Sequence, residues 1–374
     1  MNEGKETIEP EFNINGLLNI KEGWTSGNDD IDKFIKNTIY DVRNSVSVNY
    51  KLIEWVQFDR FEDIKQIGEG GFTKMEKKDP KPIKVALKKL NNSQNMTTEY
   101  LNELKTHWKF SKSYMISLQL YGMTKDLKTQ EFMMIVQFAD QGNLRNILSN
   151  NFNNILWKDK ITYLFELTMD LRNLHGLGYL HKDLHSGNIL QISDNSKINN
   201  CYISDFGLSR PSNEQISDNK ICGVLPYIAP EVLNGEPYTS SSDIYSVGVI
   251  MAELSSGKLP FYKGKHNAEL ALKICNGLRP EFGKGTPEIY KNLAYKCMNV
   301  NPNQRQTANE LFEIFKFWCN CNVYQEKDNF DYKGKEIKAI FEKADKEISN
   351  ISTSYKKDPD AIYTSRVFYI TKPL

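Results

Sequence analysis

The chain has 374 residues, of which 40% are hydrophobic and 25% are charged, so it has enough apolar material to bury the core of a globular protein. Lys and Arg together number 48 against 47 Asp and Glu, and this net charge of +1 argues against a nucleic-acid partner. The six cysteines are scattered, which indicates free thiols in a reducing compartment. Cys319 and Cys321 stand close together, but no second pair or histidine accompanies them, so we expect no metal site there.

The N-terminal segment MNEGKETIEPEFN is polar and acidic. It lacks the basic region and the apolar region of a secretory signal peptide. No uncharged apolar run approaches the ~18–20 residues that a membrane span needs. We therefore expect a cytoplasmic protein that does not bind membranes, with the nucleus as the alternative location.

The first 61 residues are expected to form an extension with one short helix. A polar leader covers 1–28, and Asp29 or Asp30 is expected to cap the helix. Apolar residues at helical spacing predict its buried face, and they are Ile31, Phe34, Ile35, Ile39 and Val42.

Residues 62–319 have the density of apolar segments that is typical of one packed domain. The first part, to about residue 136, reads as short strands with one helix at 97–110, and the second part reads mostly as helices. This order predicts an α+β fold with a small strand-rich lobe before a larger helical lobe. Residues 320–374 are expected to add a helix at 337–348, which packs on the large lobe or on a partner protein, and an extended tail.

The motif HKDLHSGNIL, at 181–190, places Asp183 and Asn188 five positions apart. An Asp that accepts a hydroxyl proton and an Asn that holds a divalent cation are what phosphoryl transfer requires beside its nucleophile. His181 and His185 could instead bind zinc if they lay on a helix. We do not favour zinc, because the glycine and the aspartate of this motif indicate a loop and no third ligand lies nearby.

The next motif, YISDFGLSR, puts Asp205 after a strand, where its carboxylate can bind Mg²⁺. LPYIAPEVL (225–233) and SSSDIYSVGV (240–249) follow it. In this order the motifs resemble the catalytic-loop, magnesium and activation-segment signatures of protein kinases. The resemblance covers about 62–319 and is closest to the tyrosine-kinase-like group.

The resemblance implies the bilobal protein kinase fold and an enzyme that uses ATP and Mg²⁺ to phosphorylate a protein substrate, on Ser or Thr rather than Tyr. Asp183 resembles the base that orients the substrate hydroxyl, while Asn188 and Asp205 resemble the Mg²⁺ ligands. Lys88, in VALK, resembles the lysine that holds the α- and β-phosphates, with Glu103 as its helix partner. The predicted catalytic residues are thus Asp183, Lys88 and Glu103.

The resemblance also predicts the nucleotide site. Glu99 is the alternative to Glu103 as the partner of Lys88, and Val136 would close the back of the adenine pocket. The residues expected to bind ATP are Ile67, Gly68, Gly70, Gly71, Ala86, Lys88, Gln137, Ala139 and Leu190.

Two buried contacts of the family are expected in the large lobe. Glu231 of the APE motif would pair with Arg305, and breaking such a pair costs ~3–5 kcal/mol because one charge is left buried and alone. Asp243 would brace the catalytic loop from its own helix.

Several residues depart from the kinase pattern. Lys182 stands where the family most often has Arg, which argues against control by phosphorylation of the activation segment. His185 and Val224 stand where serine/threonine kinases usually carry Lys and Thr, so these positions leave specificity open between Ser/Thr and Tyr. His107 is interpreted as a hydrogen-bonded core histidine.

The glycine-rich stretch is the weakest part of the pattern, because Thr73 replaces the third glycine. Met75 is followed by EKKDPKP, in which Pro80 and Pro82 cannot donate to a sheet, so we expect a stunted second strand and a loosely held flap. This stretch favours the alternative of a pseudokinase or scaffold with weak nucleotide binding. A metal or redox protein built on the histidines and cysteines is the third hypothesis.

Overall fold

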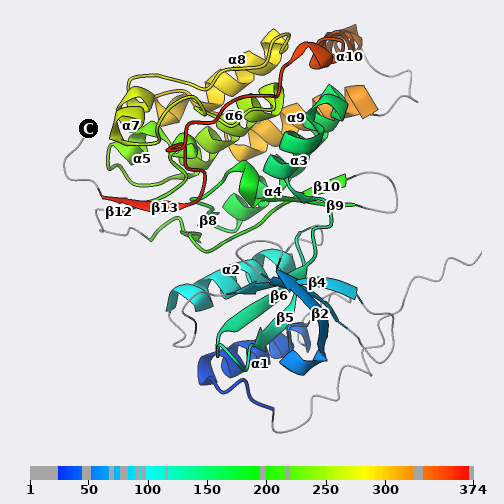
Figure 1. The fold of residues 1–374 in the computed structure, drawn as a ribbon, viewed down its shortest axis with the longest axis vertical. Helices are drawn as coiled ribbons and strands as arrows, with labels where there is room; N and C mark the ends of the chain where they lie inside the picture. The colour runs from blue at the N-terminus through cyan, green and yellow to red at the C-terminus, as the bar shows by residue number, and fades with distance from the viewer. Residues whose placement is uncertain are drawn as a thin grey trace, which may run out of the picture.

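The computed structural model shows a small lobe built around a sheet and a larger helical lobe, as Figure 1 shows, which confirms the predicted α+β class. The structure describes residues 24–43, 52–66, 71–75, 83–89, 93, 98–113, 117–193, 199–214, 220–323 and 332–369. Among these residues, no helix has both the length and the apolar character that crossing a bilayer would require.

The small lobe contains a six-stranded sheet in the order β1-β5-β6-β4-β3-β2. The strands are β1 (Glu54–Trp55), β2 (Phe61–Gln66), β3 (Gly71–Met75), β4 (Ile83–Lys89), β5 (Leu120–Lys125) and β6 (Phe132–Gln137). β1 runs parallel to β5, and the other neighbours are antiparallel. In β4, Val85 and Leu87 are buried, which is the alternation expected of a strand with one face on the core.

Both predicted helices pack in the small lobe, although the first was expected in an N-terminal extension. They are α1 (Asp29–Arg43) and α2 (Thr98–Ser113), and their apolar side chains share one cluster with β5 and β6. Ile31 and Ile35 of α1 are fully buried in this cluster beside Leu104 of α2. The apolar periodicity correctly predicts the buried face of α1. This face packs on α2 and on the sheet of the small lobe.

The predicted cap of α1 is wrong. The side-chain oxygen of Asn28 accepts hydrogen bonds of 3.1 Å from the N–H groups of Asp30 and Ile31, so Asn28 is the cap rather than Asp29 or Asp30. Asn and Asp are about equally good caps, so the local sequence did not separate the three positions.

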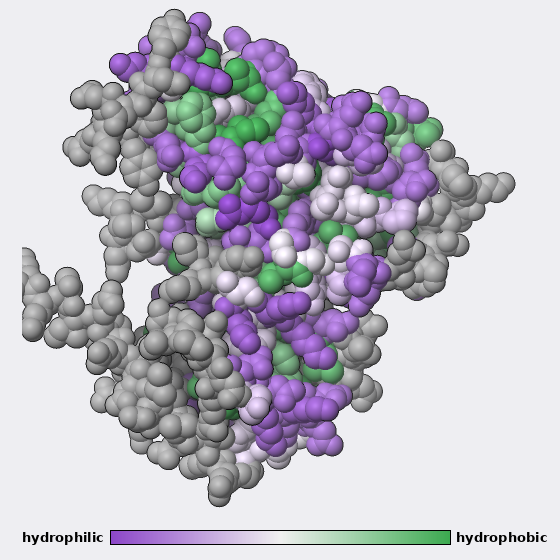
Figure 2. All heavy atoms as spheres, turned by 180° about the vertical axis from the view of Figure 1, so that it is seen from behind, coloured by the Kyte–Doolittle hydropathy of each residue, from purple (hydrophilic) through white to green (hydrophobic). Residues whose placement is uncertain are grey.

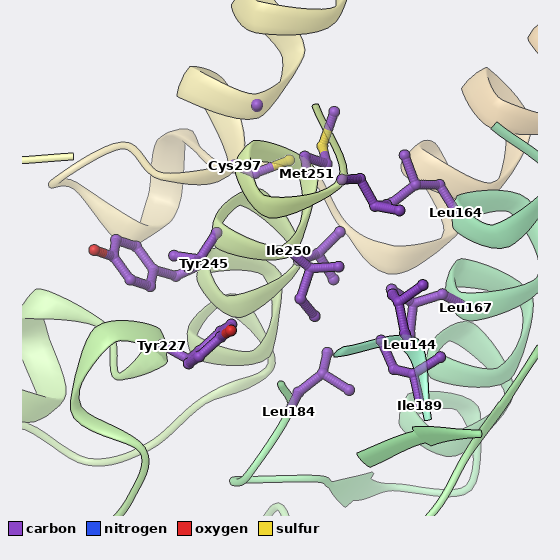
Figure 3. Close-up of a cluster of buried hydrophobic side chains, with 14 of the residues drawn as sticks. Leu144, Leu164, Leu167, Leu184, Ile189, Tyr227, Tyr245, Ile250, Met251 and Cys297 are labelled. Atoms are coloured by element: carbon purple, nitrogen blue, oxygen red, sulfur yellow. The ribbon is translucent and has the colours of Figure 1, made fainter. Parts of the chain in front are cut away.

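The core of the large lobe is drawn in Figure 3, where side chains from several helices converge on α6. The helices are α3 (Leu144–Asn151), α4 (Trp157–Gly176), α5 (Pro230–Leu233), α6 (Ser240–Ser256), α7 (Ala268–Cys275), α8 (Glu288–Cys297) and α9 (Ala308–Val323). α6 is buried from Ser242 to its end, as expected for a helix that is apolar all round. A side chain at Gly248 would lie 2.6 Å from Met298, so only glycine lets α6 approach α8 so closely.

Short strands and single turns carry the motifs between β6 and α6. The strands are β7 (Gly142–Asn143), β8 (Tyr179–Leu180), β9 (Ile189–Ser193), β10 (Asn199–Ile203), β11 (Arg210–Pro211) and β12 (Lys220–Gly223). β9 pairs with β10 and β7, and β8 pairs with β11. Short 3-10 turns occur at η2 (Phe58–Arg60), η3 (Phe152–Asn154), η4 (Ser186–Asn188), η5 (Leu225–Tyr227), η6 (Pro302–Gln304) and η7 (Ile348–Asn350).

The C-terminal helix α10 (Tyr332–Asp345) packs on the large lobe, which is the first of the two predicted options. Its Phe341 is 1% exposed and lies against Trp157 and Trp318. Beyond α10 the chain is extended, as predicted, but it is docked: Figure 1 shows it crossing the large lobe to end in β13 (Arg366–Tyr369) beside β12.

Polar and apolar side chains are mixed on the face of the molecule that Figure 2 shows. In this view, from behind, hydrophilic atoms dominate, and hydrophobic atoms form a patch at the top of the large lobe and smaller patches elsewhere. All six cysteines are free thiols, as predicted, and Cys319 and Cys321 are buried in α9.

Candidate active site

Lys88 lies between two carboxylates. Its Nζ atom is 2.8 Å from Oδ1 of Asp205 and also forms an ion pair with Oε1 of Glu103. β4 carries Lys88 and α2 carries Glu103, so Glu103 is the helix partner. Burial acts to lower the pKa of Lys88, but the two carboxylates outweigh it and raise that pKa above its usual value. The ammonium group is therefore held as a cation beside Asp205.

Asp205 follows β10 with a left-handed backbone, at a φ of 65°. Such a conformation costs free energy for a non-glycine residue and persists only where neighbours hold it. Its Oδ1 accepts from Lys88 and, at 3.3 Å, from the N–H of Gly207. Burial acts to raise the pKa of Asp205, but the charge of Lys88 holds it below its usual range. No described residue donates to Oδ2, so this oxygen is available to a cation.

Asp243 holds the segment that carries Asp183. It is fully buried in α6, and its two oxygens accept hydrogen bonds of 3.0 Å from the N–H groups of His181 and Lys182. The side chain of His175 also contacts it, at 2.9 Å. These contacts fix Lys182 in a left-handed conformation, at a φ of 69°. The prediction that Asp243 braces this loop is confirmed.

Asp183 is a buried carboxyl group, 9% exposed. Burial raises the pKa of Asp183 to about 7, and the negative charge of Asp205 adds to the rise. His185 lies beside it, with Nε2 3.8 Å from Oδ1 of Asp183. Burial and the charge of Arg145 lower the pKa of His185 to about 3, so this imidazole is neutral at pH 7. Its Nδ1 accepts the N–H of Gly187, which leaves the ring proton on Nε2, toward Asp183.

Asn188 joins the two acidic segments. Its Nδ2 donates to the backbone oxygen of Asp183 at 2.9 Å, and its own backbone oxygen accepts the N–H of Ser204 at 2.9 Å. Ser204 directly precedes Asp205. The hydrogen bond between Asn188 and Ser204 therefore brings the side-chain amide of Asn188 close to the carboxylate of Asp205. An amide oxygen and a free carboxylate oxygen are hard donors of the kind that Mg²⁺ prefers, so this pair fits a Mg²⁺ site completed by phosphate oxygens.

The predicted adenine-binding residues lie in β4, at the end of β6 and in β9. Ala86 pairs with Val136 across β4 and β6, and Val136 is 6% exposed. Leu190 belongs to β9. Past β6, no described residue accepts a hydrogen bond from the N–H of Ala139, so this donor is available to a ligand, whereas Gln137 donates its N–H to Gln119.

The glycine-rich loop is only partly within the described residues. Ile67, Gly68 and Gly70 lie outside them, as do Glu76–Pro82, which include the predicted turn. Gly71 begins β3, which ends at Met75, where the charged run starts. β3 pairs with β2 and β4 along this length, so the second strand is short but joined on both sides.

Glu231 and Arg305 form the predicted buried pair. Two hydrogen bonds of 2.7 Å join their charged groups, and the side chain of Arg305 is fully buried. The pair ties the segment after β12 to the loop before α9. Val224, at the predicted substrate loop, is 2% exposed.

His107 and His181 are held in the core by hydrogen bonds. His107 is buried with Nε2 3.0 Å from the oxygen of Leu118, and burial lowers its pKa to about 4, as expected of a hydrogen-bonded core histidine. His181 hydrogen-bonds Ser204 and the N–H of Asp183 from a loop rather than from a helix. Within the described ranges, no three His, Cys, Asp or Glu side chains are grouped as a metal site.

Two residues of this site were missed by the sequence analysis. Arg145 of α3 donates to the backbone oxygen of Tyr363 at 2.8 Å and lies 3.3 Å from Nδ1 of His185. Ser365, in the C-terminal tail, hydrogen-bonds Asp183 through its hydroxyl group. No sequence motif marked either residue, because both contacts depend on where the tail docks.

Comparison with known proteins agrees with this geometry. The family model described as the protein kinase domain matches residues 61–315. A protein of Dictyostelium discoideum named a probable serine/threonine-protein kinase is 28% identical over 250 residues, which is 66% of this chain and 15% of that protein. Another from the same organism, with the same kind of name, is 28% identical over 256 residues, 67% of this chain and 36% of that protein.

A third relative, from Acanthamoeba polyphaga mimivirus, is named as a serine/threonine-protein kinase/receptor and is 25% identical over 307 residues, 79% of this chain and 18% of that protein. The chain therefore spans only a minor part of the length of these relatives. The family model, in contrast, matches more than half of this chain. This chain belongs to the protein kinase family.

Proposed function

We propose that the chain is an active protein kinase that transfers the γ-phosphoryl group of ATP to a serine or threonine hydroxyl group of a protein. The observation that carries this proposal is the convergence of Lys88, Asp183 and Asp205 on one place, with Lys88 ion-paired to Asp205 and Asp183 within reach of the charge of Asp205.

Each group has a proposed role. Lys88, oriented by Glu103, binds the α- and β-phosphates of ATP, and the adenine ring is bound between Ala86 and Leu190 with hydrogen bonds to the backbone of Gln137 and Ala139. Ile67, Gly68, Gly70 and Gly71 are proposed to cover the phosphates. Asp205 and Asn188 would hold Mg²⁺, which when bound offsets negative charge on the phosphate oxygens.

Asp183 is proposed to position the acceptor hydroxyl group and take its proton. The bond between the acceptor oxygen and the γ-phosphorus forms, the bond from that phosphorus to the bridging oxygen of ADP breaks, and the proton passes to Asp183. A pKa of about 7 suits this role, because a base works best when its pKa is near the operating pH. Neutral His185 orients the Asp183 carboxylate from the side.

Serine or threonine is favoured as the acceptor because the three relatives are named as serine/threonine kinases. Membership of the tyrosine-kinase-like group, a cytoplasmic location with the nucleus as the alternative, and a division at residues 61 and 319 stay predictions. The competing proposal is a pseudokinase, and the short β3 strand favours it.

Titration with Mg-ATP separates the two proposals. We expect the melting temperature to rise as Mg-ATP is added, because a ligand that binds only the folded state stabilises it, by ~2.7 kcal/mol at a concentration of about 100 Kd. No shift at millimolar Mg-ATP would contradict the enzyme. Labelling of casein from γ-labelled ATP, followed by phosphoamino-acid analysis, should then give phosphoserine or phosphothreonine, and phosphotyrosine alone would contradict the specificity.

A further inference from the structure

The C-terminal tail is docked on the large lobe by buried and polar contacts. Ala361 is fully buried and Tyr363 is 7% exposed. His266 contacts the tail twice: its N–H donates to the oxygen of Asp360 at 3.0 Å, and its Nδ1 lies 2.8 Å from the oxygen of Ile362. The hydroxyl group of Tyr363 donates to the oxygen of Pro260 at 2.8 Å. These contacts lead the tail across the lobe in a defined path, which Figure 1 shows in dark red.

The last described residues of the tail form a strand on the activation segment. β13 pairs antiparallel with β12, and the partners run from Lys220 with Tyr369 to Gly223 with Arg366. β12 lies between the magnesium motif and the APE motif, directly before Val224 of the predicted substrate loop. Adding a strand to a sheet edge is a common way for a protein to bind a peptide, because the backbone supplies the affinity.

This strand pairing brings the backbone of residues 365 and 366 beside the proposed catalytic base. Ser365 precedes Arg366, which is the partner of Gly223, and a side chain added at Gly223 would lie 3.5 Å from Oδ1 of Asp183. The hydroxyl group of Ser365 hydrogen-bonds the Asp183 carboxyl group. Ser365 as a whole is exposed.

Arg145 of α3 links the residue two positions before Ser365 to the catalytic loop. Its Nη1 atom donates to the oxygen of Tyr363 at 2.8 Å, while its Nη2 lies 3.3 Å from His185, two residues after Asp183. The tail is therefore held on both sides of Ser365, by Arg145 before it and by β12 after it. Thr364, the neighbouring hydroxyl residue, is exposed.

We propose that residues 363–369 occupy the protein-acceptor site of their own chain and that Ser365 is phosphorylated there by the same molecule. This inference rests on the proposed function. The Oγ atom of Ser365 forms a bond to the γ-phosphorus of ATP, the bond to the bridging oxygen of ADP breaks, and the hydroxyl proton passes to Asp183. Until that transfer, the tail excludes other acceptors from the site.

Phosphorylation would also open the site. A phosphoserine carries ~1.5–2 negative charges at pH 7, and it would lie next to the carboxylates of Asp183 and Asp205. Like charges at this distance repel, so the phosphorylated tail should leave β12. The chain would thus change once, from a form in which its own tail occupies the acceptor site to a form in which that site is open to other protein substrates.

Phosphosite mapping of the full chain tests the assignment. Dephosphorylated protein is incubated with Mg-ATP and analysed by mass spectrometry, together with the Ser365→Ala and Thr364→Ala variants. We expect phosphate on Ser365 in the unchanged protein and in Thr364→Ala, and none at that position in Ser365→Ala. If casein is labelled but Ser365 is not, this inference is overturned and the proposed function stands. If no acceptor is labelled by any variant, both are overturned.

Dilution tests whether the transfer is intramolecular. A tethered acceptor has an effective concentration of ~1 mM whatever the protein concentration. The initial rate of Ser365 phosphorylation per molecule should therefore stay constant over about a hundredfold dilution. A rate that falls in proportion to concentration would show transfer between molecules and would overturn the proposal.

Hydrogen exchange gives a readout that does not depend on activity. The amides of β13 and β12 should exchange slowly in the unphosphorylated protein. In Ser365→Glu, which places a carboxylate against Asp183, we expect exchange of 366–369 at least about tenfold faster, which corresponds to ~1.4 kcal/mol. Thr364→Glu, one position away, is the matched control and should leave that exchange unchanged. Equal rates in both variants would contradict docking at Asp183.

Discussion

The ammonium group of Lys88 is joined to the carboxylate of Asp205 at 2.8 Å, across 117 positions of sequence. Lys88 comes from the small-lobe sheet and Asp205 from the loop after β10, so this ion pair links the two lobes at the proposed ATP site. The same ammonium group also binds Glu103, which fixes α2 relative to the sheet. The position of α2 is thus coupled to the two groups that we propose to contact the phosphates and Mg²⁺.

Replacing Lys88 by Met should remove the proposed contact to the phosphates. We expect kcat/KM for ATP to fall at least about a hundredfold, roughly 2.7 kcal/mol, because a charged donor aimed at the phosphates is lost. Steady-state kinetics with casein as acceptor measure this change. Lys89→Met is the matched control, since Lys89 pairs instead with Glu131 at 3.4 Å, and its kinetics should be nearly unchanged. An equal loss in both variants would contradict the assignment.

Phosphorylation should depend on pH through Asp183. Its pKa of about 7 means that the carboxyl group is mostly protonated at pH 6 and mostly ionised at pH 8, and only the ionised form can take the hydroxyl proton. The rate of casein phosphorylation at saturating Mg-ATP should therefore rise about tenfold per pH unit below pH 7 and level off above it. A rate that is flat from pH 5.5 to 7 would contradict this role, provided that the melting temperature shows the protein is folded throughout.

The Glu231–Arg305 pair should be a weak point of stability. Arg305→Ala leaves the Glu231 carboxylate buried without its partner, so we expect a loss of ~3–5 kcal/mol in the free energy of unfolding. Chemical denaturation measures it. The control is Lys263→Ala, because the Lys263–Glu281 pair is exposed to solvent and contributes little to stability. A small effect of Arg305→Ala would show that this buried pair tolerates separation.

Lys160 is the clearest buried charge without a hydrogen bond. It is fully buried in α4, no described residue accepts from its Nζ, and that atom lies 4.1 Å from the ring centre of Phe152. Burial lowers the pKa of Lys160 to about 7, against partial compensation from Asp345. Between pH 7 and 10.5 the unfolded chain therefore binds more protons at this residue than the folded chain does, and stability should rise with pH.

Lys160→Met should remove this dependence. We expect the variant to be more stable at pH 6 by up to ~4 kcal/mol, because the cost of burying the ammonium group disappears, and the gain should shrink toward pH 10. Thermal denaturation at several pH values measures it. Lys158→Met, on the exposed side of the same helix, should show neither effect. A variant that is destabilised at pH 6 would show that the contacts of the ammonium group with the aromatic rings outweigh its burial.

The sequence was sufficient to predict features that depend on residues close together along the chain. The spacing within HKDLHSGNIL, the position of DFG and the buried face of α1 all rest on residues that are close in sequence, and the structure places them accordingly. The family resemblance added contacts between distant residues, such as Glu231 with Arg305. The catalytic and binding roles of the site residues stay predictions, because geometry alone does not test chemistry.

The docked tail could not be predicted. RVFY has β-type residues, but nothing in these four letters specifies β12 as the partner across more than 140 positions. The position of Ser365 follows only from where the tail docks, because no local pattern brings this residue to the catalytic loop. Arg145 was missed for the same reason, because its partners lie on the tail and on the catalytic loop.

Asp183→Asn, studied in the full chain, tests the central claim most directly. Both phosphorylation of casein and binding of Mg-ATP should be measured on this variant and on Asp30→Asn, an exposed control in α1. We predict that Asp183→Asn loses phosphorylation but keeps the shift in melting temperature with Mg-ATP, while Asp30→Asn keeps both. Phosphorylation that persists in Asp183→Asn, or loss of nucleotide binding together with activity, would contradict the account of Asp183 as the base for the acceptor hydroxyl group.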